Sequence, residues 1–373
     1  MNRIQELLSL FATTSANPAK TVADWEQRTG KGAVGVMPAY SPEEIVHAAG
    51  YLPVGMWGGK RVISKARTHL PPFACSIMQS IMELQLDNVY DSLKAVMFST
   101  PCDTLKCMSQ KWYGAPQTVT FVHPQNRSLE SANIFLAEEY RIAKNKLEDI
   151  LGVRICEESI QNSIAVYNEN RQAMRAFSLV ASRYPHLVDP VQRHAVFKAR
   201  WFMEKSQHTT LVKELTAALK RQPEQRWKGK KVVLTGIMAE PNELLEILRD
   251  SGFAVADDDL AQESRQIRHD TPEGGDALMR LARWWQNLEG CSLATDRHKG
   301  RGPMLRKIVR ARKADAIIFC MMKFCEPEEF DYPIFYKQLE DEGIANLLVE
   351  IDQEATSFEQ ARTRLQTFSE VLM

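Results

Sequence analysis

The residues of this chain most suited to chemistry are its seven cysteines, at positions 75, 102, 107, 156, 291, 320 and 325. Their number is odd, their spacings are wide and no CxxC pair is present, so the sequence supports neither a zinc ribbon nor a thioredoxin-like motif. Reduced cysteines are usually small buried hydrophobes, but thiolates also bind soft metals and iron–sulfur clusters. The stretch IIFCMMKFCEPEEFDYP, residues 317–333, presents this choice directly, because Cys320 and Cys325 flank a methionine-rich run.

Three of the cysteines follow predicted strands or open predicted helices, where open α/β sheets place their functional residues. Cys102 follows the strand pattern AVMFS and opens a helix at Asp103, Cys75 opens the helical pattern SIMQS, and Cys325 follows the strand pattern AIIFCMM. A thiol at a helix N-terminus feels the positive end of the helix dipole, so we expect lowered thiol pKa values. These three residues are candidates to converge on one cofactor, and spacing alone leaves metal binding and inert burial equally open.

The other four cysteines have a simpler interpretation. Cys156 and Cys291 are predicted to be buried, inert thiols, and Cys320 lies inside a strand pattern as a small apolar side chain. Cys107 lies five residues beyond Cys102, which on a helix turns it to a different face.

The elements that must position the three thiols form two α/β regions. Residues 33–125 alternate strand patterns with helical patterns, which predicts a parallel sheet covered by helices on both faces. One helical pattern, residues 41–50, has Ser41 as its expected N-cap, Pro42 in its first turn and Gly50 as its end. Strand patterns disappear from about residue 128 to 221 and return after a basic segment near residue 225.

We therefore predict two Rossmann- or flavodoxin-like parallel-sheet lobes joined by a helical segment, with the cofactor in the cleft between the lobes. The predicted boundaries are 1–127 for the N-terminal lobe, 128–227 for the helical segment and 228–373 for the C-terminal lobe.

Composition excludes several classes of partner. The 47 basic and 47 acidic residues give a formal net charge of zero, which offers no general attraction to nucleic acid or to an anionic membrane. The longest apolar run, AIIFCMM, is far short of the ~18 residues that span a bilayer, and the N-terminus has no signal-peptide pattern. We expect a cytoplasmic protein.

Six longer stretches carry a resemblance to a known family: FACSIMQS, PCDTLKC, FVHPQNR, DDLAQESRQ, LARWWQNLEGCSLA and MMKFCEPEEFDYP. They resemble the 2-hydroxyacyl-CoA dehydratase family, which also includes the ATP-dependent benzoyl-CoA reductases. The similarity covers nearly the whole chain. It is greatest to the beta subunits of heterodimeric dehydratases that act on (R)-2-hydroxyisocaproyl-CoA, phenyllactyl-CoA or lactoyl-CoA.

The resemblance implies an oxygen-sensitive 4Fe–4S cluster held by three cysteines from separate segments. The matching residues are Cys75 in FACS, Cys102 in PCDT and Cys325 in KFCEP. The fourth iron of such clusters has a non-cysteine ligand, or binds the substrate oxygen in the alpha subunit. Cys107 and Cys320 lie close in sequence to these residues, so each is a candidate for a fourth thiolate or for a group that tunes the cluster.

The implied reaction is the syn removal of water from a 2-hydroxyacyl-CoA to give the (E)-2-enoyl-CoA. A separate iron–sulfur activase hydrolyses ATP and injects one electron, which forms a ketyl radical anion on the substrate. The radical expels the hydroxyl group and acidifies the C3 proton, and the electron is then recovered. A homologous alpha subunit would hold most of the acyl-CoA. No Walker A motif is present here, so ATP chemistry is expected on the activase.

Other polar residues are weaker candidates. Gln262, Glu263 and Arg265 follow a predicted strand and are candidates to support the cluster or the subunit contact, although a polar helix start is the commoner role. His123 also follows a predicted strand. It is a candidate acid–base group, although a structural role is the commoner one for such a histidine.

Around the thiols, the resemblance favours a dry pocket that keeps the cluster potential low. Ser41 and Glu44 lie in a region that meets substrate in the alpha subunits, although Ser41 is already explained as a helix cap. The apolar neighbours expected to form the pocket, or simply to pack the core, are Phe73, Ile77, Met78, Met321, Met322 and Phe324.

Two other functions remain open from the sequence. One is a subunit of a benzoyl-CoA-reductase-type oxidoreductase, which would add electrons to a ring or double bond. The other is a metal-free α/β binding or assembly protein that retains the fold.

Overall fold

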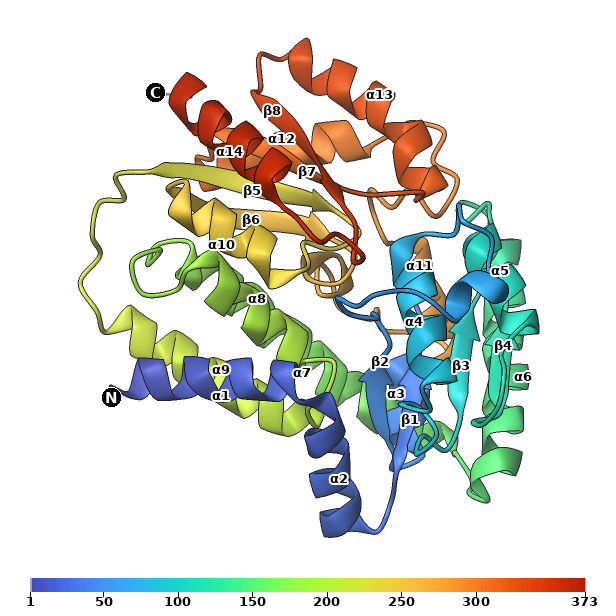
Figure 1. The fold of residues 1–373 in the computed structure, drawn as a ribbon. Helices are drawn as coiled ribbons and strands as arrows, with labels where there is room; N and C mark the ends of the chain where they lie inside the picture. Colours follow the sequence, from blue (N-terminus) through green and yellow to red (C-terminus); the bar gives the residue numbers. More distant parts are fainter. Residues whose placement is uncertain (1, 373) are drawn as a thin grey trace.

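The framework of the chain is a pair of parallel four-stranded sheets, visible in the computed structural model of residues 2–372 (Figure 1). The first sheet has the order β2-β1-β3-β4 and the second has the order β6-β5-β7-β8, so the two share one topology. The strands of the first sheet are β1 (Ala33–Val36), β2 (Leu52–Gly55), β3 (Val96–Ser99) and β4 (Thr118–Phe121). Those of the second are β5 (Lys230–Gly236), β6 (Phe253–Leu260), β7 (Ala316–Met322) and β8 (Asn346–Ile351).

Both sheets form as the sequence predicts, because their central strands carry short apolar runs. All seven residues of β7 are buried, as are all four of β1 and of β3. A strand buried on both faces reads as a continuous apolar run, which is typical of parallel sheets covered by helices.

Helices of the first lobe follow its strands in alternation. They are α3 (Glu43–Ala48), α4 (Ser76–Leu86), α5 (Asp103–Gln110) and α6 (Glu130–Leu151), with a 3₁₀ turn at Ala66–Thr68. The expected N-cap at Ser41 is wrong: α3 begins after Pro42, and no side chain caps it. The Ser41 hydroxyl instead donates to the carbonyl oxygen of Met37 at 3.1 Å, so it stabilises the turn that leaves β1.

The second lobe is built in the same way. Its helices are α10 (Asn242–Asp250), α11 (Ala277–Gln286), α12 (Arg301–Arg312), α13 (Glu326–Glu340) and α14 (Glu359–Val371), with a 3₁₀ turn at Ser264–Gln266. One of them, α11, packs against α6 of the first lobe and thereby ties the two lobes together.

Between the sheets, the chain is helical as predicted. The long α7 (Glu157–Ala181) is followed by α8 (Pro190–Ala199) and α9 (Lys205–Lys220). The N-terminal helix α1 (Arg3–Ala16) packs on α8 and α9, and α2 (Pro18–Thr29) leads from it to β1 (Figure 1). Helix α1 buries Ile4, Leu7, Leu8 and Phe11, the spacing that places side chains on one helical face. Within residues 2–372, no helix is both long and apolar enough to cross a membrane.

Candidate metal centre

The three thiols selected from the sequence line one cleft of about 860 Å³. Each is the N-cap residue of a different helix: Cys75 of α4, Cys102 of α5 and Cys325 of α13. None of the three caps its helix with its own side chain, so the thiol groups remain available to a ligand. The structure therefore brings together residues that are up to 250 positions apart in the sequence.

Cys325 is positioned by the sharp turn that leaves β7. Phe324 has a φ of 61°, in the left-handed region that side chains other than glycine rarely adopt. Its backbone N–H donates to the Glu329 carboxylate at 2.9 Å, and the Cys325 N–H donates to the carbonyl oxygen of Met322 at 3.0 Å. These bonds stabilise the strained turn and place Cys325 at the start of α13.

Cys75 is positioned by its neighbour Ser76, which joins the two lobes. The Ser76 hydroxyl donates to the sulfur of Met322 at 3.3 Å and accepts the backbone N–H of Gln353 at 3.0 Å. The Gln353 amide also donates to the carbonyl oxygen of Trp57 at 3.0 Å. The start of α4 is thus held against the carboxyl ends of β7 and β8, beside Cys325.

The expected lowering of the thiol pKa values is wrong for this protein without a metal. Burial raises the pKa of the Cys75 thiol to about 12, although backbone N–H groups of Met78 and Ile77 act in the opposite direction. Burial also raises the pKa values of Cys102 and Cys325. All three groups are therefore neutral thiols at neutral pH, and a bound cation is needed to deprotonate them.

Iron–sulfur clusters are held by cysteine thiolates, and three cysteines line this cleft. Within residues 2–372, no three His, Cys, Asp or Glu side chains lie close enough together to hold one ion. In a 4Fe–4S cluster each thiolate binds a different iron, so its sulfurs stand farther apart than the ligands of one ion. Three thiols around one cleft of this volume are compatible with such a cluster.

The other thiols lie outside the cleft. Cys107 is exposed on α5, and Cys320 is buried inside β7, where burial raises its thiol pKa. Cys291 is buried, as predicted, with its sulfur 2.9 Å from the hydroxyl oxygen of Tyr40. Cys156, which was predicted to be buried, is exposed as the N-cap residue of α7.

His123 lines the same cleft as the three thiols. Its side chain is 2% exposed, and neither ring nitrogen has a hydrogen-bonding partner among the described residues. The ring packs against Trp285 and Phe121, with centroid distances of 4.5 and 5.4 Å. Burial lowers the pKa of His123 to about 3, so the ring is neutral and is not poised for acid–base chemistry near neutral pH.

Gln262, Glu263 and Arg265 are buried in the second lobe rather than exposed. Glu263 accepts from Arg193 at 2.6 Å and lies 2.7 Å from a ring nitrogen of His194. Arg265 pairs with Asp259, and the Gln262 amide donates to Glu240 at 2.8 Å, so all three side chains have partners within the protein.

A second set of buried charges, which the sequence did not reveal, supports the helix after Cys325. Glu328, three residues beyond Cys325, accepts from Arg301 at 2.6 Å, and Arg301 also donates to Asp259 at 2.8 Å. Arg265 lies 3.5 Å from the other oxygen of Glu328. The sequence signal for these buried charges was the acidic run CEPEEF. One of its carboxylates, Glu328, is buried on the helix that begins after the candidate ligand Cys325.

Glu44 also forms a buried ion pair, with Arg171 of α7. Together with Ser41, it borders a cavity of only about 20 Å³, which is too small for an acyl thioester. In this chain the Ser41 region is therefore closed by its own side chains.

The predicted dry pocket is only partly formed. Ile77, Met78, Met321 and Met322 are buried, as expected for apolar residues around the thiols. Phe324 is 39% exposed and lines the cleft with the thiols, whereas Phe73 is 63% exposed and does not line it. The pocket is therefore more open than a dry one.

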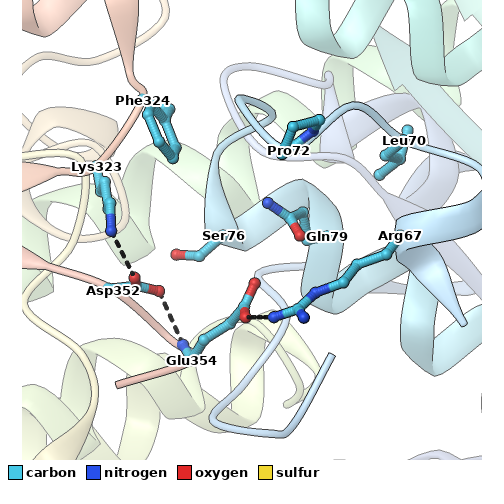
Figure 2. Close-up of a pocket in the computed structure, with 9 residues that line it drawn as sticks. All are labelled: Arg67, Leu70, Pro72, Ser76, Gln79, Lys323, Phe324, Asp352 and Glu354. Atoms are coloured by element: carbon cyan, nitrogen blue, oxygen red, sulfur yellow. Dashed lines mark hydrogen bonds and ion pairs between the residues drawn. The ribbon is translucent and has the colours of Figure 1, made fainter. Parts of the chain in front are cut away.

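A second cavity, of about 290 Å³, lies beside the cleft (Figure 2). Phe324 lines both spaces. The basic groups of the second cavity are paired, because Arg67 contacts Glu354 at 2.9 Å and Lys323 lies 3.7 Å from Asp352. This cavity therefore has no unpaired positive charge for a phosphate group.

Comparison with known proteins identifies the family of the chain. Residues 38–372 match the family described as 2-hydroxyglutaryl-CoA dehydratase, D-component. The chain is 58% identical to the lactoyl-CoA dehydratase subunit beta of Anaerotignum propionicum and 41% identical to the (R)-phenyllactyl-CoA dehydratase beta subunit of Clostridium sporogenes, over the full length of each chain. It is 34% identical to the (R)-2-hydroxyglutaryl-CoA dehydratase subunit beta of Acidaminococcus fermentans, over 99% of this chain and 100% of the relative. This chain therefore belongs to the 2-hydroxyglutaryl-CoA dehydratase D-component family.

Proposed function

We propose that this chain is the beta subunit of a heterodimeric (R)-2-hydroxyacyl-CoA dehydratase, a hydro-lyase, and that it carries a 4Fe–4S cluster. The observation that carries the proposal is the meeting of three helix N-caps, Cys75, Cys102 and Cys325, around one cleft. Full-length similarity to three beta subunits of dehydratases supports the reaction class.

In this proposal the three thiolates hold the cluster, which supplies one-electron transfer when bound. The protein contributes a site at the junction of two lobes, fixed by the Ser76–Gln353 contact and by the turn at Phe324. Raised thiol pKa values imply that cluster binding releases protons, because coordinating cysteines must be thiolates.

The electron would come from an ATP-hydrolysing iron–sulfur activase that docks transiently. One electron added to the substrate thioester gives a ketyl radical anion. The radical anion loses hydroxide and then the acidified C3 proton. Return of the electron to the enzyme gives the (E)-2-enoyl-CoA. The homologous alpha subunit would hold most of the acyl-CoA. An oxygen-sensitive centre of this kind implies the cytoplasm of an anaerobic cell.

The first substrate to assay is (R)-lactoyl-CoA, because the relative with 58% identity is named for lactoyl-CoA. Phenyllactyl-CoA and 2-hydroxyisocaproyl-CoA are the next, and activity with one of them alone would assign the acyl group.

The central experiment is metal analysis of the anaerobically purified complex of this chain with its alpha subunit. Cys75, Cys102 and Cys325 are each replaced by serine, with Cys107→Ser as the matched control, since Cys107 is exposed outside the cleft. We expect each of the three variants to lose most of the iron and sulfide of this subunit, and the control to retain it. Unchanged iron in all three variants would refute the assignment.

The two alternative functions predict different results. A benzoyl-CoA-reductase-type subunit would give net reduction of an aryl or enoyl thioester instead of dehydration, which product analysis distinguishes. A metal-free binding or assembly protein would be colourless and contain no iron after anaerobic purification.

A further inference from the structure

The buried ring of His123 has an unused hydrogen-bonding capacity. At 2% exposure, both of its nitrogens lack a partner among the described residues. Most buried polar atoms in folded proteins are hydrogen-bonded, and an orphaned one calls for an explanation such as a missing ligand. A neutral imidazole offers one N–H donor and one acceptor nitrogen, so it can bind a neutral or anionic group without a change in charge.

Strand register brings His123 to the thiol site. Ser99 of β3 pairs with Phe121 of β4, Cys102 follows Ser99 by three residues, and His123 follows Phe121 by two. Because the strands are parallel, both residues leave the sheet at the same edge. Both also line the cleft that Cys75 and Cys325 share.

The aromatic neighbours of His123 do not satisfy it. Trp285, 4.5 Å away between ring centroids, has an indole N–H that is itself unpaired among the described residues, and Tyr140 packs edge-on at 6.4 Å. Trp285 and Tyr140 do not line the cleft, whereas His123 does. Each ring nitrogen is itself covered, so a group in the cleft can bond to the ring only after the side chain turns toward it.

We propose that His123 donates a hydrogen bond from its ring N–H to the iron–sulfur cluster, either to a sulfur or to the ligand of the iron that lacks a cysteine. This inference rests on the proposed function, which supplies the cluster. A hydrogen bond to such a cluster stabilises its reduced, more negative form and so raises its reduction potential. In this scheme His123 is a positioning and tuning residue, and the thiolates remain the iron ligands.

The test compares His123→Phe, which keeps an aromatic ring beside Trp285, with His123→Asn, which keeps an N–H donor. His298→Asn is the control, since His298 is exposed. The readouts on the anaerobic heterodimer are iron content, the midpoint potential from a redox titration followed by electron paramagnetic resonance, and hyperfine coupling to ¹⁵N-labelled histidine.

We expect His123→Phe to retain its iron, to shift the midpoint potential of this subunit's cluster to a more negative value and to lose the histidine coupling. His123→Asn should recover part of the potential shift, and the control should match the wild type. A cluster with wild-type potential and coupling in His123→Phe would overturn this inference and leave the proposed function standing.

Two further outcomes would also be decisive. A wild-type subunit without iron would overturn both the proposed function and this inference. After removal of iron, His123→Phe should be at least as resistant to urea as the wild type, since it replaces an unpaired imidazole with an apolar ring. Lower resistance of both His123 variants in that state would assign the ring a structural role and overturn the inference.

Discussion

Two buried histidines, His123 and His194, have opposite surroundings although each is 2% exposed. His194 of α8 lies 2.7 Å from Glu263 and 3.1 Å from Glu240. Burial lowers its pKa, but hydrogen bonds to the two carboxylates outweigh burial and raise the pKa to about 9. His123 has no such partner among the described residues, and burial alone lowers its pKa to about 3.

The same contrast separates the regions around the two residues. Beyond the second sheet, the carboxylates of Asp258, Asp259 and Glu263 are each paired with buried arginines. At the cleft, the thiols of Cys75, Cys102 and Cys325 and the ring of His123 have no charged hydrogen-bonding partner within residues 2–372. Polar groups that are paired within the chain stabilise the fold, whereas the unpaired polar groups of the cleft can still bind a ligand.

The largest effect is expected from breaking the buried ion pairs beyond the second sheet. Arg301→Met removes one partner of both Glu328 and Asp259 while Arg265 still contacts each of them, and breaking a buried ion pair costs up to about 3–5 kcal/mol of unfolding free energy. Urea unfolding measures this loss. We also expect lower iron content, because Glu328 supports the helix that begins at Cys325.

Arg306→Met is the control for that experiment. Arg306 contacts Glu342 on the surface, where both side chains are about one-third exposed, and such pairs contribute about 0–1 kcal/mol. Equal losses in the two variants would contradict the distinction between buried and surface pairs.

A pH dependence should arise from His194. Its pKa is raised from about 6.5 in the unfolded chain to about 9 in the folded chain, so its stabilising contribution is complete below pH 6.5 and is lost as the pH rises through 9. Since one pKa unit corresponds to about 1.4 kcal/mol, up to about 3 kcal/mol is at stake.

His194→Gln should therefore reduce the fall in unfolding free energy between pH 6.5 and 9, measured by urea titration at several pH values. His123→Phe should leave that fall unchanged, because the folded-state pKa of His123 lies far below this range. A pH profile of His194→Gln that matches the wild type would argue against the ion-paired state of His194.

The smallest effect is expected from Cys320→Ala. This residue lies wholly inside β7, so removal of its sulfur should cost about 1 kcal/mol, as for a typical core substitution. Iron content should not change, since the side chain does not line the cleft. Loss of iron in this variant would identify Cys320 as a fourth ligand.

Much of the site follows from local sequence signals. The sequence places Cys75 and Cys102 at helix starts and Cys325 after a strand, and the structure has all three as N-caps. The expected N-cap at Ser41 is wrong because its hydroxyl donates to the carbonyl oxygen of Met37, four residues earlier in the turn after β1, a local alternative that residue type does not reveal.

The sequence by itself determined the two parallel sheets, the helical segment between them and the places of the three thiols at the ends of strands or the starts of helices, because apolar periodicity and capping positions are properties of neighbouring residues. Only the tertiary structure decided the sign of the thiol pKa shifts, the burial of Glu263 and Arg265, and the isolation of His123. Those properties depend on which groups lie nearby in space, since desolvation and pairing act between residues that the sequence separates by up to hundreds of positions.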